Sequence, residues 1–157
     1  MAGTHTALSD NRKTKPGLAK RRISIVVAEW NADITEALFE GAWETLRKLG
    51  MPKDHIKRVT VPGSFELPLA AQWEASKKDV DAVICLGCVI QGETAHFDYI
   101  CQAVAYGIMR VSLKSSKPVA FGVLTTLDKK QALSRAGGAH GNKGEEAALT
   151  VVSMLGH

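Results

Sequence analysis

The fold is decided by the stretch Ala82-Val83-Ile84-Cys85-Leu86-Gly87-Cys88-Val89-Ile90, which runs directly into Gln91-Gly92-Glu93-Thr94-Ala95-His96. The first nine residues are almost wholly apolar and include several β-branched side chains, as is typical of a strand buried on both faces. The second part is short and polar, and it leads into a helical pattern over residues 96–114. A strand, a tight loop and a helix in this order predict one unit of a parallel sheet.

The same alternation recurs on both sides of this stretch. Short apolar runs predict three further strands, at 23–28, 56–61 and 118–125. Apolar residues at helical spacing predict four further helices, at 33–49, 64–77, 128–136 and 143–155. Strands that alternate with helices form parallel sheets covered on both faces. We therefore predict an α/β fold, a three-layer α/β/α sandwich around a four-stranded, mainly parallel sheet.

Basic charge is concentrated near the N-terminus. The 157 residues carry a net charge of +4, yet residues 1–22 alone hold six basic residues and one acidic residue. Residues 23–157 therefore have a net charge of −1. We interpret residues 1–22 as a mobile basic arm and residues 23–157 as one folded domain. Because a nucleic-acid-binding domain needs excess basic residues on its folded body, we expect no nucleic-acid partner.

The sequence also predicts where the protein works. No stretch approaches the ~18 consecutive apolar residues of a membrane-spanning helix, so we expect no membrane partner. The N-terminus lacks the apolar core of a secretory signal, and the three cysteines suit a reducing compartment, so we expect a cytoplasmic protein. Cys85 and Cys88 form a C-x-x-C, but residues three apart in a strand point to opposite faces. We expect both to be buried rather than to form a redox or metal pair.

Ligands of parallel α/β sheets bind at the carboxyl ends of the strands, so the loops that follow the strands form the candidate site. Trp30 follows the first strand, Ser64-Phe65-Glu66 follows the second, and Gly92-Glu93-Thr94 with His96 follows the third. A turn does not require this set of aromatic, acidic and histidine side chains. Trp30 could stack on a flat ligand or pack on the neighbouring helix. Glu66 could bind a ligand N–H group or complement a helix dipole.

Several residues near predicted helix ends could bind an anion or move a proton. Gly92-Glu93-Thr94 meets a helix N-terminus, whose free N–H groups can bind an anion, although a plain helix cap explains the motif equally well. His96 could exchange protons near neutral pH or serve as a cap residue. Arg135 and Lys143 could reach a phosphate or simply end their helices. No second histidine or cysteine stands at metal-ligand spacing from His96, so we expect no metal.

Together these motifs resemble the lumazine synthase family, which catalyses the penultimate step of riboflavin biosynthesis. The resemblance covers residues 23–157 and rests on Trp30-Asn31, 61–68, 86–99, 121–126, 135–137 and 141–144. It implies a flavodoxin-like fold assembled into homopentamers, and a transferase that needs no cofactor. The implied reaction condenses 5-amino-6-(D-ribitylamino)uracil with 3,4-dihydroxy-2-butanone 4-phosphate through a Schiff base, phosphate elimination and ring closure, and it yields 6,7-dimethyl-8-ribityllumazine.

The resemblance also implies roles for single residues. His96 would move protons, Lys143 would line the site, and the phosphate of the butanone would be held by Glu93, Thr94 and Arg135. The pyrimidine and its ribityl chain would be bound by Trp30, Ser64, Phe65, Glu66, Cys88, Val89, Ile90 and Phe121. Sites in this family lie between neighbouring subunits. Phe121 and Arg135 would therefore come from a different chain than Trp30 and His96.

Two positions depart from the usual family pattern. Trp30 stands where phenylalanine is commoner, which predicts stronger stacking on flavin-like rings and retention of riboflavin. Gln91 stands where a basic residue is frequent, so one cation is missing near the phosphate loop. The short connection over 135–141 resembles members that close into icosahedral 60-subunit shells rather than stopping at pentamers or decamers. The alternative hypothesis is a flavodoxin-like riboflavin- or flavin-binding module without catalysis, against which the presence of Thr94, His96 and Arg135 argues.

Overall fold

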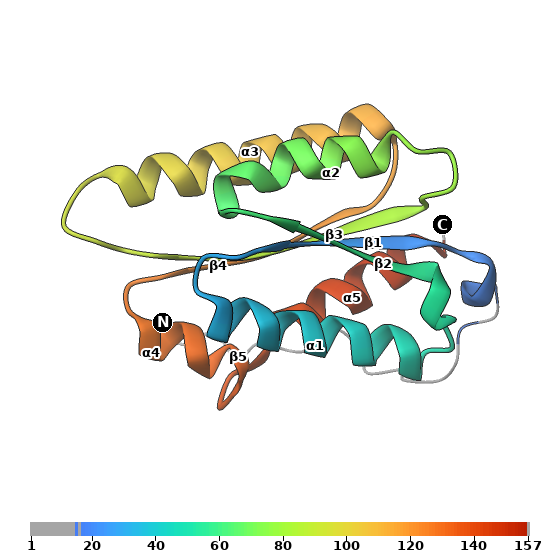
Figure 1. Cartoon of the computed structure of the whole chain (residues 1–157), viewed down its shortest axis with the longest axis horizontal. Helices are drawn as coiled ribbons and strands as arrows, with labels where there is room; N and C mark the ends of the chain where they lie inside the picture. Colours follow the sequence, from blue (N-terminus) through green and yellow to red (C-terminus); the bar gives the residue numbers. More distant parts are fainter. Residues whose placement is uncertain (1–14, 16, 157) are drawn as a thin grey trace.

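A four-stranded parallel sheet forms the middle layer of the molecule (Figure 1). The structure, a computed structural model, describes residue 15 and residues 17–156 of the chain. The strands lie in the order β2-β1-β3-β4, with bounds β1 (Ile23–Ala28), β2 (Ile56–Val61), β3 (Ala82–Ile90) and β4 (Val119–Thr126). All three neighbouring pairs are parallel. The predicted sheet is thereby confirmed.

Helices cover both faces of this sheet, which confirms the three-layer α/β/α architecture. One face carries α1 (Ala32–Lys48) and α5 (Lys143–Met154), with the short α4 (Lys129–Ser134) on the same side (Figure 1). The opposite face carries α2 (Leu67–Ala75) and α3 (His96–Ser115). α1, α2 and α3 each connect one strand of the sheet to the next along the chain, as expected for crossovers between parallel strands.

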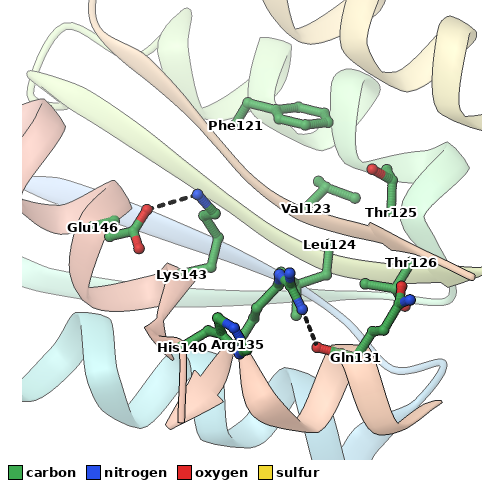
Figure 2. Close-up of a pocket in the computed structure, with 10 residues that line it drawn as sticks. All are labelled: Phe121, Val123, Leu124, Thr125, Thr126, Gln131, Arg135, His140, Lys143 and Glu146. Carbon is green, nitrogen blue, oxygen red and sulfur yellow. Dashed lines mark hydrogen bonds and ion pairs between the residues drawn. The ribbon is translucent and has the colours of Figure 1, made fainter. Parts of the chain in front are cut away.

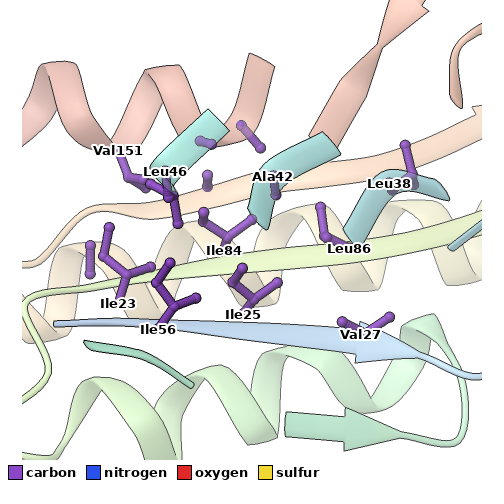
Figure 3. Packing of buried hydrophobic residues seen from close by; sticks show 14 of the residues in the cluster. Ile23, Ile25, Val27, Leu38, Ala42, Leu46, Ile56, Ile84, Leu86 and Val151 are labelled. Carbon is purple, nitrogen blue, oxygen red and sulfur yellow. The ribbon is translucent and has the colours of Figure 1, made fainter. Parts of the chain in front are cut away.

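Two apolar cores lie on the two faces of the sheet, because successive strand residues point in opposite directions. Ile25 and Ile84 pack toward α1 and α5, where Leu38 is fully buried (Figure 3). Val26 and Cys85 belong to the other core. Full burial of a side chain of this kind contributes roughly 1.5–3 kcal/mol, so the two cores supply most of the driving force for folding.

The C-x-x-C motif divides between these two cores, as the sequence predicts. Cys85 is buried toward α2 and α3, whereas Cys88 is buried toward α1 and α5. Burial raises the pKa of the Cys85 thiol to about 12. Burial, together with the negative charge of Asp33, raises the pKa of Cys88 to about 11. Both thiols therefore stay protonated at neutral pH and act as small apolar side chains.

Short elements differ from the prediction in two places. The expected helix over 64–77 is divided into a 3-10 turn, η3 (Ser64–Glu66), and α2, in which Pro68 occupies the first turn. The expected helix over 128–136 ends at Ser134, and an antiparallel hairpin of β5 (Ala136–Gly138) and β6 (Gly141–Asn142) follows it. Gly137 and Gly141 have φ values of 101° and 78°. Glycine adopts such left-handed conformations readily, which permits the tight hairpin.

The last residues of the predicted basic arm pack against the body. Residues 1–14 and 16 lie outside the described part, but a 3-10 turn, η1 (Leu18–Lys20), precedes β1 and Leu18 is buried in the core. Arg21 forms an ion pair with Asp81 at 3.0 Å, and the backbone N–H of Arg22 donates to the same carboxylate at 2.8 Å. The packed body therefore begins before residue 22, because Leu18 and Asp81 anchor this segment.

A buried carboxylate ties α2 to the amino-terminal ends of β1 and β2. Glu74 is almost fully buried and accepts a hydrogen bond from Ser24 Oγ at 2.8 Å. Lys57 Nζ lies 3.1 Å from its Oε1, and Lys77 binds the same oxygen. Burial by itself raises the pKa of Glu74, but hydrogen bonds from Lys77, Ser24 and Lys57 outweigh it and lower the pKa below the ordinary value. Glu74 is therefore a charged anchor within an otherwise apolar layer.

Candidate functional site

An aromatic pocket opens at the carboxyl ends of β1, β2 and β3. It has a volume of about 440 Å³. Its lining residues are Trp30, Asn31, Gly63, Ser64, Phe65, Glu66, Cys88, Val89, Ile90, His96 and Ile100. The pocket thus brings together His96 and every residue that the sequence predicts for pyrimidine binding except Phe121. Its position is the one expected for a ligand site of a parallel α/β sheet.

The loop after β1 presents Trp30 to this pocket. The Trp30 side chain is 73% exposed, while its backbone N–H donates to the carbonyl of Pro62 at 3.1 Å. Asn31 adopts a left-handed conformation with φ 60° and ψ 50°. Its side-chain Nδ2 donates to the carbonyl oxygen of Cys88 at 3.1 Å. The indole is therefore open to a ligand although its backbone is fixed to β2 and β3.

The segment after β2 supplies a carboxylate and a hydroxyl. Glu66 Oε2 accepts a hydrogen bond from the backbone N–H of Gly63 at 3.0 Å, so one oxygen closes the 3-10 turn η3. Ser64 is only 7% exposed, and its Oγ has no hydrogen-bond partner among the described residues. A buried hydroxyl without a partner costs free energy. A ligand that hydrogen-bonds Ser64 in this pocket would recover it.

The loop between β3 and α3 is exposed along its whole length. Glu93 and Thr94 do not line the aromatic pocket. Thr94 Oγ1 accepts a hydrogen bond from the backbone N–H of His96 at 3.4 Å, as a residue near a helix start commonly does. His96 is the first residue of α3 and lines the aromatic pocket, so the N-terminus of this helix lies next to the pocket. Phosphate binding by Glu93 and Thr94 stays a prediction.

An edge pocket of about 390 Å³ lies beside β4, the last strand of the sheet (Figure 2). It is lined by Phe121, Val123, Leu124, Thr125, Thr126, Gln131, Arg135, His140, Lys143 and Glu146. Arg135 Nη1 donates to the carbonyl of Gln131 at 3.1 Å and to Ser134 Oγ at 3.2 Å. Lys143 forms an ion pair with Glu146 at 2.6 Å. This pocket holds three further predicted residues, Phe121, Arg135 and Lys143.

All the predicted site residues except Glu93 and Thr94 therefore fall into two groups on one chain. None of the described residues lines both the aromatic pocket and the edge pocket. Among the same residues, no group of three or more His, Cys, Asp or Glu side chains is arranged to hold a metal ion. No helix of the described chain is long and apolar enough to cross a membrane.

Sequence reasoning missed several lining residues. Asn31 follows Trp30 directly, so its position beside the pocket could have been predicted from the sequence. Glu146 stands one helical turn after Lys143, a spacing that favours ion pairs. His140 carried no such signal, because the hairpin that places it beside β4 was not predicted. Gln131 lies within the helix predicted over 128–136, where nothing distinguished it from a surface residue.

Comparison with known proteins identifies the family of the chain. The profile of the family described as 6,7-dimethyl-8-ribityllumazine synthase matches residues 20–157. The protein of that name from Cytophaga hutchinsonii is 61% identical over 155 residues, 99% of this chain and 98% of the relative. Those from Porphyromonas gingivalis, 50% identical over 99% of this chain and 98% of the relative, and from Coxiella burnetii, 47% identical over 85% and 89%, bear the same name. The chain thus belongs to the 6,7-dimethyl-8-ribityllumazine synthase family, an enzyme family of riboflavin biosynthesis.

Proposed function

We propose that this chain condenses 5-amino-6-(D-ribitylamino)uracil with 3,4-dihydroxy-2-butanone 4-phosphate, and that each active site combines the aromatic pocket of one chain with the edge pocket of another. The aromatic pocket carries this proposal. It gathers an exposed indole, Phe65, Glu66 and His96 at the carboxyl edge of the sheet. A flat, polar heterocycle fits such a mixture of aromatic faces and hydrogen-bonding groups.

The pyrimidine would bind first to the aromatic pocket. Trp30 and Phe65 offer apolar faces for its ring, and Ser64 offers an unpaired hydroxyl. The second oxygen of Glu66 can accept a ligand N–H or ribityl hydroxyl while the first holds Gly63. Much of the rate acceleration would come from holding two reactive substrates together, since good orientation alone gives large effective molarities.

The chemistry needs proton transfers that an imidazole can supply. The substrate amine attacks the ketone carbonyl and forms a Schiff base with loss of water. The hydroxyl-bearing carbon then loses a proton as phosphate departs, which leaves an enol that tautomerises to a new ketone. The second amine closes the ring on this ketone with loss of another water. His96 lines the pocket at the start of α3 and is the side chain placed to move these protons.

The edge pocket supplies groups that the aromatic pocket lacks. Arg135 carries the positive charge suited to a phosphate, and its Nη1 is already positioned by Gln131 and Ser134. Phe121 is partly exposed on the outermost strand. Because the two pockets have separate linings, we assign Phe121, Arg135 and Lys143 to the site of a neighbouring chain, in a homo-oligomer that binds two small-molecule substrates and needs no cofactor.

An exposed apolar stripe on α3 supports the assembly. Tyr99, Tyr106, Met109 and Leu113 are all exposed and follow the spacing of a coiled-coil seam. A second copy of this chain would cover the stripe, which supports a homo-oligomer, and the homopentamer is the assembly that the family resemblance implies. The short hairpin of β5 and β6 favours closure of pentamers into a 60-subunit shell. Light scattering separates the two, since a shell is about twelve times the mass of a pentamer.

The cytoplasm is the compartment we propose for this reaction. Cys85, Cys88 and Cys101 are all free thiols, and the first two are buried in separate cores. Cytoplasmic proteins commonly keep their cysteines in this reduced state.

The decisive experiment mixes both substrates with the pure protein and follows lumazine absorbance and fluorescence. We expect product well above the uncatalysed rate. A protein that binds riboflavin and quenches its fluorescence, but makes no product above the uncatalysed rate, would instead be a flavin-binding module. The matched control is the Arg135→Ala variant, which keeps the aromatic pocket intact and should bind the pyrimidine yet turn over slowly.

A further inference from the structure

The cations of the edge pocket are unequally available to a ligand. Lys143 is held by Glu146 at 2.6 Å, so its charge is already compensated within the protein. Arg135 Nη1 donates to a backbone carbonyl and to a hydroxyl group. No carboxylate among the described residues forms an ion pair with Arg135. A phosphate monoester carries between one and two negative charges at neutral pH. Arg135 alone leaves part of that charge without a partner.

The loop that would face the phosphate from the other chain does not supply the missing charge. Residues 91–95 contain no basic side chain, and Glu93 adds a negative one. The N-terminus of α3 contributes only a partial positive charge, equivalent to roughly half an elementary charge. A further cation is therefore required on the side of the edge pocket.

His140 lines the edge pocket together with Arg135. Its backbone N–H donates to the carbonyl of Ser134 at 2.7 Å, which fixes the turn between β5 and β6 beside the end of α4. Asn142, two residues further on, donates from Nδ2 to the carbonyl of Ala37 in α1 at 2.9 Å. The hairpin is thus clamped at both ends, while the exposed imidazole makes no hydrogen bond to another described residue.

We propose that His140 is a further phosphate-binding residue, whose imidazole joins Arg135 on the phosphate group of the butanone substrate. The proposal rests on the proposed function. The charged groups that share its cavity are Arg135, Lys143 and Glu146. Side chains of these three types ordinarily keep their charge between pH 6 and 8, whereas a histidine gains a positive charge toward the acidic end of that range.

Steady-state kinetics of His140→Ala and His140→Lys test the proposal. We expect His140→Ala to raise KM for the butanone phosphate about tenfold and to weaken competitive inhibition by inorganic phosphate equally. KM for the pyrimidine and kcat should change less than about twofold, because the imidazole acts on the phosphate alone. His140→Lys should restore most of the phosphate affinity. The matched control is His55→Ala, since His55 lies on η2 (Lys53–His55), outside both pockets.

The pH dependence separates charge from a merely structural role. The ratio of KM for the butanone phosphate in His140→Ala to that in the unmodified protein should be larger at pH 6 than at pH 8. Using this ratio cancels the ionisation of the phosphate itself. Unchanged KM and inhibition by phosphate in His140→Ala, or a rise that His140→Lys does not reverse, would overturn the proposal. An unmodified protein that forms no lumazine refutes the proposed function instead.

Discussion

Asn31 reaches across the end of the sheet and donates a hydrogen bond from Nδ2 to the carbonyl oxygen of Cys88. The bond joins the loop after β1 to β3, and it does so from a residue in the left-handed conformation. Trp30 is the preceding residue, so the bond controls where the indole lies relative to the pocket floor. Asn31 is accordingly a positioning residue in this arrangement.

Replacing Asn31 separates the hydrogen bond from the backbone conformation. Asn31→Ala removes the hydrogen bond and also places a residue that disfavours φ 60° at this position. We expect the free energy of unfolding to fall by about 1–2 kcal/mol. Asn31→Gly tolerates φ 60° and loses only the amide, so its loss of stability should be smaller. Both variants should raise KM for the pyrimidine, measured by steady-state kinetics. Equal stability of the two variants would show that the left-handed backbone has no cost here.

Trp30 should account for most of any affinity for riboflavin. Trp30→Ala removes the largest exposed aromatic surface of the pocket, and we expect riboflavin to bind about tenfold more weakly. Fluorescence quenching during a riboflavin titration measures the affinity. We expect the affinity of Trp30→Phe to lie between those of Trp30→Ala and the unmodified protein. Trp73→Ala is the matched control, because Trp73 is also exposed but lies outside both pockets. Undiminished quenching in Trp30→Ala would place riboflavin elsewhere.

His96→Ala should slow turnover without abolishing it. The loss of a general acid-base group typically costs about 10²–10⁴-fold, whereas the binding of both substrates is retained. The rate of lumazine formation measures this, after light scattering has shown that the variant assembles. If a correctly assembled His96→Ala protein were fully inactive, orientation would contribute less than we expect.

Mixed assemblies test whether two chains share each site. His96→Ala and Arg135→Ala lie in different pockets, so a site built from two chains can receive both intact residues from two damaged ones. Random assembly at equal amounts should make about a quarter of the sites intact. Activity after joint unfolding and refolding should therefore exceed the mean of the separate variants. Activity that merely equals that mean would mean that each chain holds a complete site.

Glu74 should make stability fall in acid. Its pKa is lowered in the folded protein, so it stabilises the fold above the ordinary glutamate pKa of about 4.3, and this stabilisation is lost as the pH falls through the lowered value. Glu74→Gln should lower the free energy of unfolding by about 1–2 kcal/mol at pH 7, because Ser24 and two partly exposed lysines lose a charged acceptor. Urea unfolding at fixed protein concentration, at pH 7 and pH 3, measures both effects. Glu44→Gln is the control, since its ion pair with Lys48 is exposed.

The sheet and most of the lining of the aromatic pocket could be predicted from the sequence, because both depend on local patterns. β3 is a continuous apolar run, and the polar residues of the aromatic pocket stand just after the ends of strands in the sequence. The opposite burial of Cys85 and Cys88 follows from strand periodicity alone. These features require no knowledge of distant contacts.

The features that were missed depend on contacts between distant residues. The hairpin of β5 and β6 is short and rich in glycine, so it has almost no apolar pattern, and it is held by the bond from Asn142 to Ala37. Leu18 looks isolated in a basic segment, and only the surrounding core shows why it is buried. The separation of the edge pocket from the aromatic pocket is likewise a property of the folded chain.

The position of Phe121 and Arg135 beside the outermost strand has a consequence for how the protein can function. If each chain contributes halves of two different sites, an open row of chains always ends in two unused halves. Only a closed ring pairs every half-site with its complement. The number of active sites per chain therefore measures how many rings are closed. Under this arrangement dilution would inactivate the enzyme by separating subunits before any single chain unfolds.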